Sequence, residues 1–176
     1  RRWATKRSLP PISIPITSRK KKKPLQVREK CDILYVNING KESTMNDTTI
    51  LEIYTDSAEK TELCGAQLAR LMLDTPELPR FVALDGDLGA GKTAFTRGFC
   101  SVVCPGAAVP SPTYALVNEY RGDPDVFHFD VYRITDEDDL YSTGFFDYPE
   151  RGGIILCEWA VNIPYALPEK YISAVI

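Results

Sequence analysis

The sequence Gly-Asp-Leu-Gly-Ala-Gly-Lys-Thr at residues 86–93 restricts the possible fold more than any other feature of the chain. It matches the P-loop pattern, in which a glycine and four variable residues precede Gly-Lys-Thr. The glycines let the backbone wrap closely around phosphate groups with its N–H groups turned inward. An apolar run precedes the loop and an amphipathic stretch follows it. This strand–loop–helix order predicts a phosphate-binding loop.

The residue types in the loop indicate which ligands it takes. We expect Asp87, Leu88, Gly89, Ala90, Gly91, Lys92 and Thr93 to contact a nucleotide. The helix that begins near Lys92 would add the positive end of its dipole. The Lys92 ammonium can reach the β- and γ-phosphates, and the Thr93 hydroxyl can ligate Mg²⁺. The loop therefore predicts a nucleotide and Mg²⁺ as ligands.

The order of apolar runs and turn residues predicts an α/β fold. Strand-like runs occupy residues 50–54, 81–84, 115–120, 126–132, 154–157 and 171–176. Helical periodicity follows Asp56, with Cys64, Leu68, Leu71 and Met72 on one face, and resumes after the P-loop. Residues 115–132 are typical of an antiparallel hairpin, and a short helix is expected near Thr135. We predict a three-layer P-loop NTPase fold with a mostly parallel, mixed β-sheet.

Charge divides the chain into two parts. Residues 1–44 contain 12 Lys or Arg and three acids, together with several prolines, which favours a disordered basic extension. Residues 45–176 contain nine basic and 21 acidic residues, and we expect them to form the P-loop domain, with a C-terminus that is possibly truncated. A domain of net charge −12 is poorly suited to holding RNA or DNA by itself. We therefore expect any contact with nucleic acid to be indirect.

The remaining composition suits a cytoplasmic protein. The five cysteines form no Cys-x-x-Cys pair, so buried reduced thiols are more plausible than a zinc site or disulfides. No stretch approaches the roughly 18 apolar residues of a membrane-spanning helix. We expect no membrane partner.

Two acids that end apolar runs are candidates for the metal and the attacking water. Asp130 ends Phe-His-Phe-Asp, and Glu158 ends Ile-Ile-Leu-Cys-Glu. In parallel sheets, ligands gather beyond the carboxyl ends of the strands, where the P-loop also lies. His128, the one histidine, fits a strand position better than the role of a catalytic base. For Trp159, the pattern leaves open a core position and a position over the site.

Four motifs in this order resemble those of the TsaE (YjeE) family, small ATPases of bacterial tRNA threonylcarbamoyladenosine synthesis. The motifs are the P-loop, Ser-Pro-Thr-Tyr at residues 111–114, His-Phe-Asp-Val-Tyr-Arg at 128–133 and Cys-Glu-Trp at 157–159. The resemblance spans residues 51 to about 171. It does not cover residues 1–44.

The resemblance implies specific roles for these residues. Thr93 and Glu158 would ligate Mg²⁺, Asp130 and Glu158 would act in ATP hydrolysis together with Lys92, and Trp159 would support the bound nucleotide. Residues 111–113 would form a switch-like loop. The family supports the transfer of threonylcarbamoyl to adenosine 37 of tRNAs that read ANN codons, which TsaB and TsaD carry out. ATP, Mg²⁺, TsaB and TsaD are thus the implied cofactors and partners.

Two other classes stay open on the sequence. A P-loop kinase of a small metabolite or nucleoside would need an arginine-bearing lid, and the arginines after residue 45 are not clustered. A nucleotide-gated binding module without turnover would share the same loop. A guanine-specific GTPase is disfavoured because the sequence contains no Asn-Lys-x-Asp.

Overall fold

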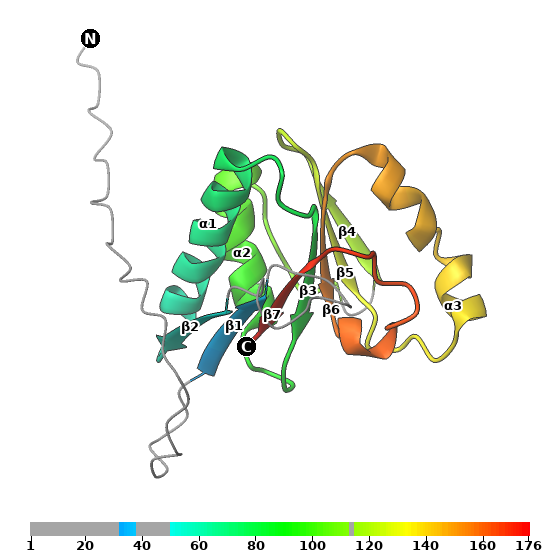
Figure 1. Cartoon of the computed structure of the whole chain (residues 1–176), viewed down its shortest axis with the longest axis horizontal. Coiled ribbons are helices and arrows are strands. Elements are labelled where there is room, and N and C mark those ends of the chain that lie inside the picture. The colour runs from blue at the N-terminus through cyan, green and yellow to red at the C-terminus, as the bar shows by residue number, and fades with distance from the viewer. Residues whose placement is uncertain (1–31, 38–49, 113–114) are drawn as a thin grey trace.

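The structure, a computed structural model, describes residues 32–37, 50–112 and 115–176. These residues form one seven-stranded sheet in the order β2-β1-β7-β3-β6-β5-β4 (Figure 1). The strands are β1 (Asp32–Asn37), β2 (Ile50–Thr55), β3 (Phe81–Asp85), β4 (Val117–Tyr120), β5 (Val126–Asp130), β6 (Ile154–Glu158) and β7 (Ile172–Val175).

The centre of the sheet is parallel and its edges are antiparallel. Strand β3 pairs in parallel with β6 and β7, and β6 pairs in parallel with β5. Strand β4 joins β5 as an antiparallel hairpin, as the sequence predicts, and β1 pairs antiparallel with β2 and β7. Because β3, β5 and β6 run in the same direction, their carboxyl ends lie at one edge of the sheet.

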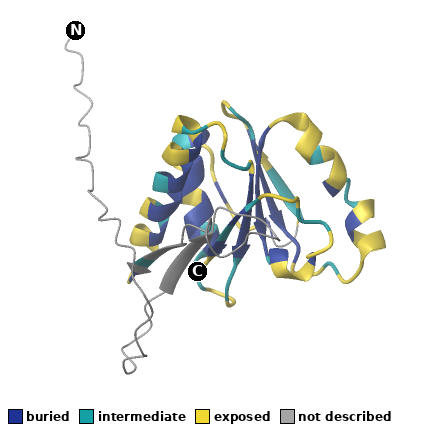
Figure 2. Cartoon of the chain, viewed as in Figure 1, coloured by how far each residue is buried: buried dark blue, intermediate teal, exposed yellow. Residues whose placement is uncertain are grey.

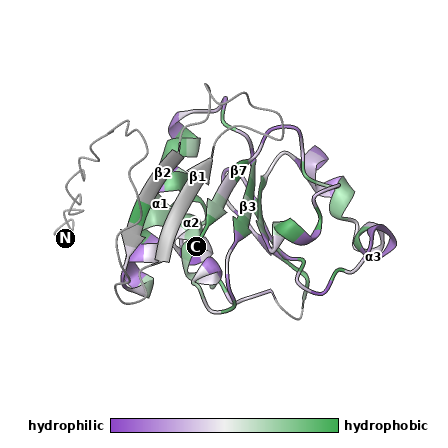
Figure 3. Ribbon diagram, turned by 60° about the horizontal axis from the view of Figure 1, so that its bottom comes forward, coloured by the Kyte–Doolittle hydropathy of each residue, from purple (hydrophilic) through white to green (hydrophobic). Residues whose placement is uncertain are grey.

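Helices cover both faces of the sheet and produce the predicted three layers (Figure 1). On one face lie α1 (Ala58–Asp74) and α2 (Lys92–Val103). On the other lie α3 (Glu137–Ser142) and the 3₁₀ segments η1 (Phe145–Arg151) and η2 (Ala160–Asn162). Every residue of β5 and β6 is buried, so neighbouring elements cover both faces of these strands (Figure 2). Strand β3 beside them is mostly hydrophobic (Figure 3).

The alternation of side chains along the strands sorts the core into two parts. Val126, Ile154 and Leu156 pack with Phe95 and Phe99 on the α1–α2 face. Phe127, Phe129, Ile155 and Cys157 pack on the opposite face with Leu140 and Phe145. Since successive strand residues point to opposite faces, His128, Asp130 and Glu158 lie on the face that α1 and α2 cover.

Helix α1 differs from the sequence interpretation in two details. Its N-cap is Ser57, whose hydroxyl accepts the Lys60 N–H at 3.3 Å, so the helix start signal is one residue later than Asp56. Asp56 instead pairs with the Lys60 ammonium. Leu71, expected on the inner face, is 45% exposed, whereas Cys64, Leu68 and Met72 are buried.

Helices α1 and α2 approach closely at two glycines. A Cβ on Gly98 would lie 1.7 Å from the Glu62 carbonyl oxygen, and a Cβ on Gly65 would lie 2.0 Å from the Phe95 carbonyl oxygen. Only glycine permits this backbone separation. The contact fixes α2, and with it the P-loop, against α1.

Strand β1 corrects the expectation that residues 1–44 are disordered. Its six residues pair with β2 along their whole length and with β7 over three positions. The sequence Ile-Leu-Tyr-Val at residues 33–36 is rich in β-forming residues, and the sheet offers it a strand on either side. The rest of this extension, and Met45 after it, lie outside the described residues.

The expectation for the cysteines is confirmed within the described residues. Cys64, Cys100, Cys104 and Cys157 are free and buried. Burial raises the pKa of each of these thiols above its ordinary value. In the same part of the chain, we find no helix with the length and apolar character needed to span a membrane.

Candidate functional site

The P-loop connects the end of β3 to the start of α2. Gly91, the N-cap of α2, has φ 113° and brings no side chain to the helix N-terminus. Gly86 has φ 136°, and a Cβ there would lie 2.1 Å from the Ile176 carbonyl oxygen. Leu88, at 86% exposure, projects from the loop. The loop thus presents backbone N–H groups and the positive end of a helix dipole, as an anion site requires.

Lys92 lies inside this loop. Its Nζ donates to the Gly86 and Asp87 carbonyl oxygens at 2.8 and 2.9 Å, and only 5% of the residue is exposed. Burial lowers the pKa of the ammonium, and the nearby carboxylates of Glu158 and Asp130 partly offset that effect. The charge is therefore held where the phosphates of a nucleotide would lie.

Thr93 and Glu158 are joined across 65 residues of sequence. The Thr93 hydroxyl donates to Glu158 Oε1 at 2.9 Å. Glu158 is 4% exposed and ends β6, which is adjacent to β3. Because the Thr93 hydrogen points to the carboxylate, the lone pairs of its oxygen stay available to a cation.

Asp130 stands next to Glu158. The two are register partners at the ends of β5 and β6. Asp130 Oδ1 accepts the Tyr132 N–H at 3.0 Å, and the residue is 6% exposed. The structure therefore brings together Lys92, Thr93, Asp130 and Glu158, all of which the sequence singled out.

Trp159 lies over the lysine, which answers a question that the sequence left open. Its ring centroid is 3.9 Å from Lys92 Nζ, a cation–π distance, and 4.9 Å from the Tyr132 ring. Its backbone is in the left-handed region, with φ 62°. The Trp159 N–H donates to the Leu84 carbonyl at 2.9 Å, which ties this turn to β3.

Asp85, at the end of β3, is a local hydrogen-bond acceptor. Its Oδ1 accepts the Val161 N–H at 3.0 Å, which anchors η2 beside the P-loop. Burial raises the pKa of this carboxyl, and the bond from Val161 and the charge of Lys92 partly offset the rise.

His128 occupies the strand position that the sequence predicts, in β5, and it also contacts an acid of the site. Its Nε2 lies 2.8 Å from Glu158 Oε1, and the residue is fully buried. One signal could have shown this contact: His128 is two residues before Asp130, so both side chains lie on the same face of β5.

The oxygen atoms gathered here fit Mg²⁺. The cation prefers hydroxyl, carboxylate, phosphate and water oxygens, and proteins usually supply one or two of its ligands. Thr93 and Glu158 offer such oxygens next to the P-loop. No group of three or more His, Cys, Asp or Glu side chains suited to a metal occurs in the described part of the chain. This arrangement fits a cation shared with phosphates better than an all-protein cage.

Part of the expected switch-like loop can also be placed. Ser111 and Pro112 are described, and the Pro112 carbonyl accepts the N–H groups of Ala115 and Leu116 at 2.9 Å each. Leu116 has φ 67°, and its carbonyl accepts the Asp130 N–H at 3.0 Å. The end of this loop is thus tied to an acid of the site. Thr113 and Tyr114 lie outside the described residues.

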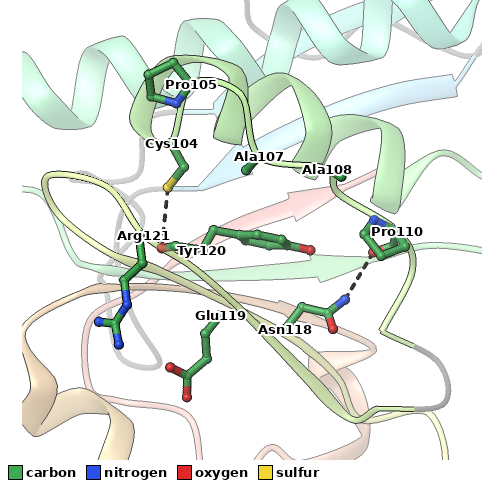
Figure 4. Close-up of a pocket in the computed structure, with 9 residues that line it drawn as sticks. All are labelled: Cys104, Pro105, Ala107, Ala108, Pro110, Asn118, Glu119, Tyr120 and Arg121. Atoms are coloured by element: carbon green, nitrogen blue, oxygen red, sulfur yellow. Dashed lines mark hydrogen bonds between the residues drawn. The ribbon is translucent and has the colours of Figure 1, made fainter.

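A separate surface pocket of about 430 Å³ lies where α2 ends and β4 ends (Figure 4). Its lining residues come from the segments after α2 and along β4, and none belongs to the P-loop. Two hydrogen bonds cross it, from the Cys104 thiol to the Tyr120 carbonyl and from the Asn118 amide to the Pro110 carbonyl. The pocket is therefore distinct from the phosphate site.

Known proteins resemble this chain along most of the described domain. The family described as "Threonylcarbamoyl adenosine biosynthesis protein TsaE" matches residues 55–176. A relative named tRNA threonylcarbamoyladenosine biosynthesis protein TsaE, from Haemophilus influenzae, is 40% identical over 107 residues, which are 60% of this chain and 68% of the relative. The protein of the same name from Bacillus subtilis is 41% identical over 96 residues, which are 54% of this chain and 60% of the relative.

A solved structure supports the same conclusion. The crystal structure of YdiB from Bacillus subtilis has a TM-score of 0.50 and 29% sequence identity, and the match covers 69% of this chain and 72% of that one. The matched family region includes the P-loop and both acids at the strand ends. The chain belongs to the TsaE family of threonylcarbamoyl adenosine biosynthesis proteins.

Proposed function

We propose that the chain is a Mg²⁺-dependent ATPase required to form the threonylcarbamoyl group on adenosine 37 of tRNAs that read ANN codons. The observation that supports this most is the junction of Lys92, Thr93 and Glu158 in one buried cluster at the P-loop. Family membership supports the place of the chain in tRNA modification.

The geometry suggests how each residue contributes. The P-loop N–H groups and Lys92 would hold the β- and γ-phosphates of ATP, once the Lys92 ammonium exchanges its carbonyl partners for phosphate oxygens. Thr93 and Glu158 would hold Mg²⁺, which neutralises charge on the phosphates when bound. Trp159 would keep water from one side of the Lys92 ammonium and strengthen its attraction to phosphate.

Asp130 is suited to orienting the attacking water. A water oxygen would attack the γ-phosphorus, the bond to the β–γ bridging oxygen would break, and the released electron pair would leave on ADP. The water must lose its proton, and a buried carboxylate beside Glu158 can accept or direct it. Asp130 Oδ1 accepts the Tyr132 N–H, which holds the carboxylate at the end of β5.

We further propose that turnover depends on TsaB and TsaD and takes place in the cytoplasm. The domain after residue 45 has a net charge of −12, which favours contact with tRNA through partners. Residues 111–113 are suited to report the γ-phosphate to a partner, since the chain just after them is tied to the site where the Leu116 carbonyl accepts the Asp130 N–H. A partner that binds the ATP-loaded arrangement more tightly would raise turnover, and ATP would tighten the partner equally.

The experiment is hydrolysis of ATP labelled at the γ-phosphate, with and without purified TsaB and TsaD. We expect slow release of labelled phosphate by the chain alone and a clear rise with both partners. Thr93→Ala should lose this activity. The exposed Lys60 provides a matched control, since it contacts Asp56 at the surface, and Lys60→Ala should keep full activity.

Two outcomes would overturn the proposal. Label that moves to a metabolite or nucleoside, rather than to water, would identify a kinase. Equal rates of ATP hydrolysis with and without TsaB and TsaD, together with equal binding to them in the presence and absence of ATP, would contradict a partner-dependent ATPase.

A further inference from the structure

We propose that His128 is a positioning residue that fixes Glu158 for Mg²⁺, an inference that rests on the proposed function. His128 lies inside β5, two residues before Asp130 at the end of the strand. It acts on the site through one hydrogen bond to Glu158 Oε1, at 2.8 Å. The residue is the one histidine of the sequence and is fully buried.

The two hydrogen bonds to Glu158 use the same oxygen atom. Thr93 donates to Oε1 from α2, and His128 contacts Oε1 from β5. Neither of these bonds uses Oε2. The carboxylate is therefore held from two sides, with its rotation fixed and one oxygen left for a cation. Partners of this kind orient metal ligands in proteins and commonly change metal affinity by about 10–100-fold.

The environment of the ring selects its tautomer. Nδ1 is buried and has no hydrogen-bond partner among the described residues. With the proton on Nδ1, a buried donor would be left unpaired, and the lone pair of Nε2 would face the lone pairs of Oε1. With the proton on Nε2, the ring donates to Glu158 and leaves only an acceptor unpaired. The second arrangement avoids both penalties.

The packing of the strand keeps the ring in this place. In register, His128 lies between Asn118 of β4 and Leu156 of β6. The Tyr120 ring lies beside it, at a centroid distance of 6.4 Å. A side chain so enclosed has few alternative rotamers, so the bond to Glu158 is built before any ligand arrives.

The test distinguishes loss of the hydrogen-bond donor at position 128 from a general destabilisation of the fold. His128→Gln keeps an N–H donor that can reach Glu158, whereas His128→Phe keeps an aromatic ring and removes the donor. Nucleotide affinity is measured by calorimetry in EDTA and then across a Mg²⁺ titration. Tyr120→Phe is the matched control, since it changes a buried side chain beside the ring without touching Glu158.

We expect His128→Phe to weaken the apparent Mg²⁺ affinity about 10–100-fold. Its nucleotide affinity in EDTA should stay within about twofold of the parent, and His128→Gln should recover most of the Mg²⁺ response. Equal losses of Mg²⁺ affinity in His128→Phe and His128→Gln would overturn the role of His128. A loss of nucleotide affinity in EDTA as large as the loss in Mg²⁺ would overturn it as well. Absence of nucleotide binding by the parent chain would instead overturn the proposed function.

A second measurement needs no variant and so holds even if His128→Phe fails to fold. Nitrogen NMR of the imidazole identifies the tautomer, and the natural sequence has only one histidine to assign. We expect the proton on Nε2 in the nucleotide-free protein. A ring protonated on Nδ1 alone would contradict the donor role.

Discussion

Asp130 and Glu158 stand opposite each other in register where the parallel strands β5 and β6 end. The 27 residues between them include α3 and η1 on the far face of the sheet and then most of β6, so the two acids reach the same edge from different strands. The P-loop leaves β3 at that edge, beside β6. Acids of different motifs thereby share one site.

The first prediction concerns Lys92→Ala. The side chain binds loop carbonyls and lies over Trp159 rather than in the apolar core, so its loss should remove charge from the phosphate site without unfolding the domain. A charge-assisted contact is worth about 1.5–3 kcal/mol, which is roughly tenfold to a hundredfold in affinity. Calorimetry with ATP measures the loss, and circular dichroism checks the fold. Unchanged affinity in a folded variant would exclude this loop as the nucleotide site.

Asp130→Asn should separate binding from hydrolysis. The amide oxygen can still accept the Tyr132 N–H, so the local turn is kept, but the group can no longer take a proton. We expect ATP to stay bound and hydrolysis to fall by about 10²-fold or more, the usual scale for a positioned acid–base group. Rates are compared in the presence of TsaB and TsaD. Normal turnover of the variant would leave Asp130 with a structural role alone.

Gly98→Ala should destabilise the domain. The new Cβ would overlap the Glu62 carbonyl on α1, and helix backbones cannot move apart without disturbing the core around Phe95 and Phe99. Overpacking of this kind costs about 1–3 kcal/mol. Chemical denaturation measures the change. Arg70→Ala, at an exposed position of α1, is the control and should change stability little.

The ion pair between Glu119 and Arg151 predicts a mild pH dependence. Hydrogen bonds from Arg151 lower the pKa of Glu119 to about 2. The pair thus stabilises the fold above the unfolded pKa of Glu119, about 4.5, and this contribution disappears as the pH falls toward 2. Glu119→Gln should lower the melting temperature by no more than a few degrees at pH 7, because exposed pairs are screened by water. The difference should shrink near pH 2.5; a constant difference would assign the effect to packing instead.

The sequence predicts those parts of the structure whose signals are local. The P-loop, the hairpin of β4 and β5 and the apolar strand β6 each carry a short-range pattern. Strand β1 was missed, since it lies in a segment rich in lysine and proline and one of its two partners, β7, is distant in sequence. The contact between His128 and Glu158 was missed because it joins β5 to the end of β6. Trp159 lies over Lys92 only because its φ of 62° turns the chain after β6.

The bond between Thr93 and Glu158 also makes the site depend on completion of the fold. The strand order β3-β6-β5 means that the loop and its acids meet only after residues 154–158 insert between two earlier strands. A growing chain that ends before this point has the loop but lacks Glu158. The proposed Mg²⁺-dependent binding would therefore require the completed sheet. A nucleotide that binds only the folded domain would in turn stabilise it by mass action, so that a filled site resists unfolding more than an empty one.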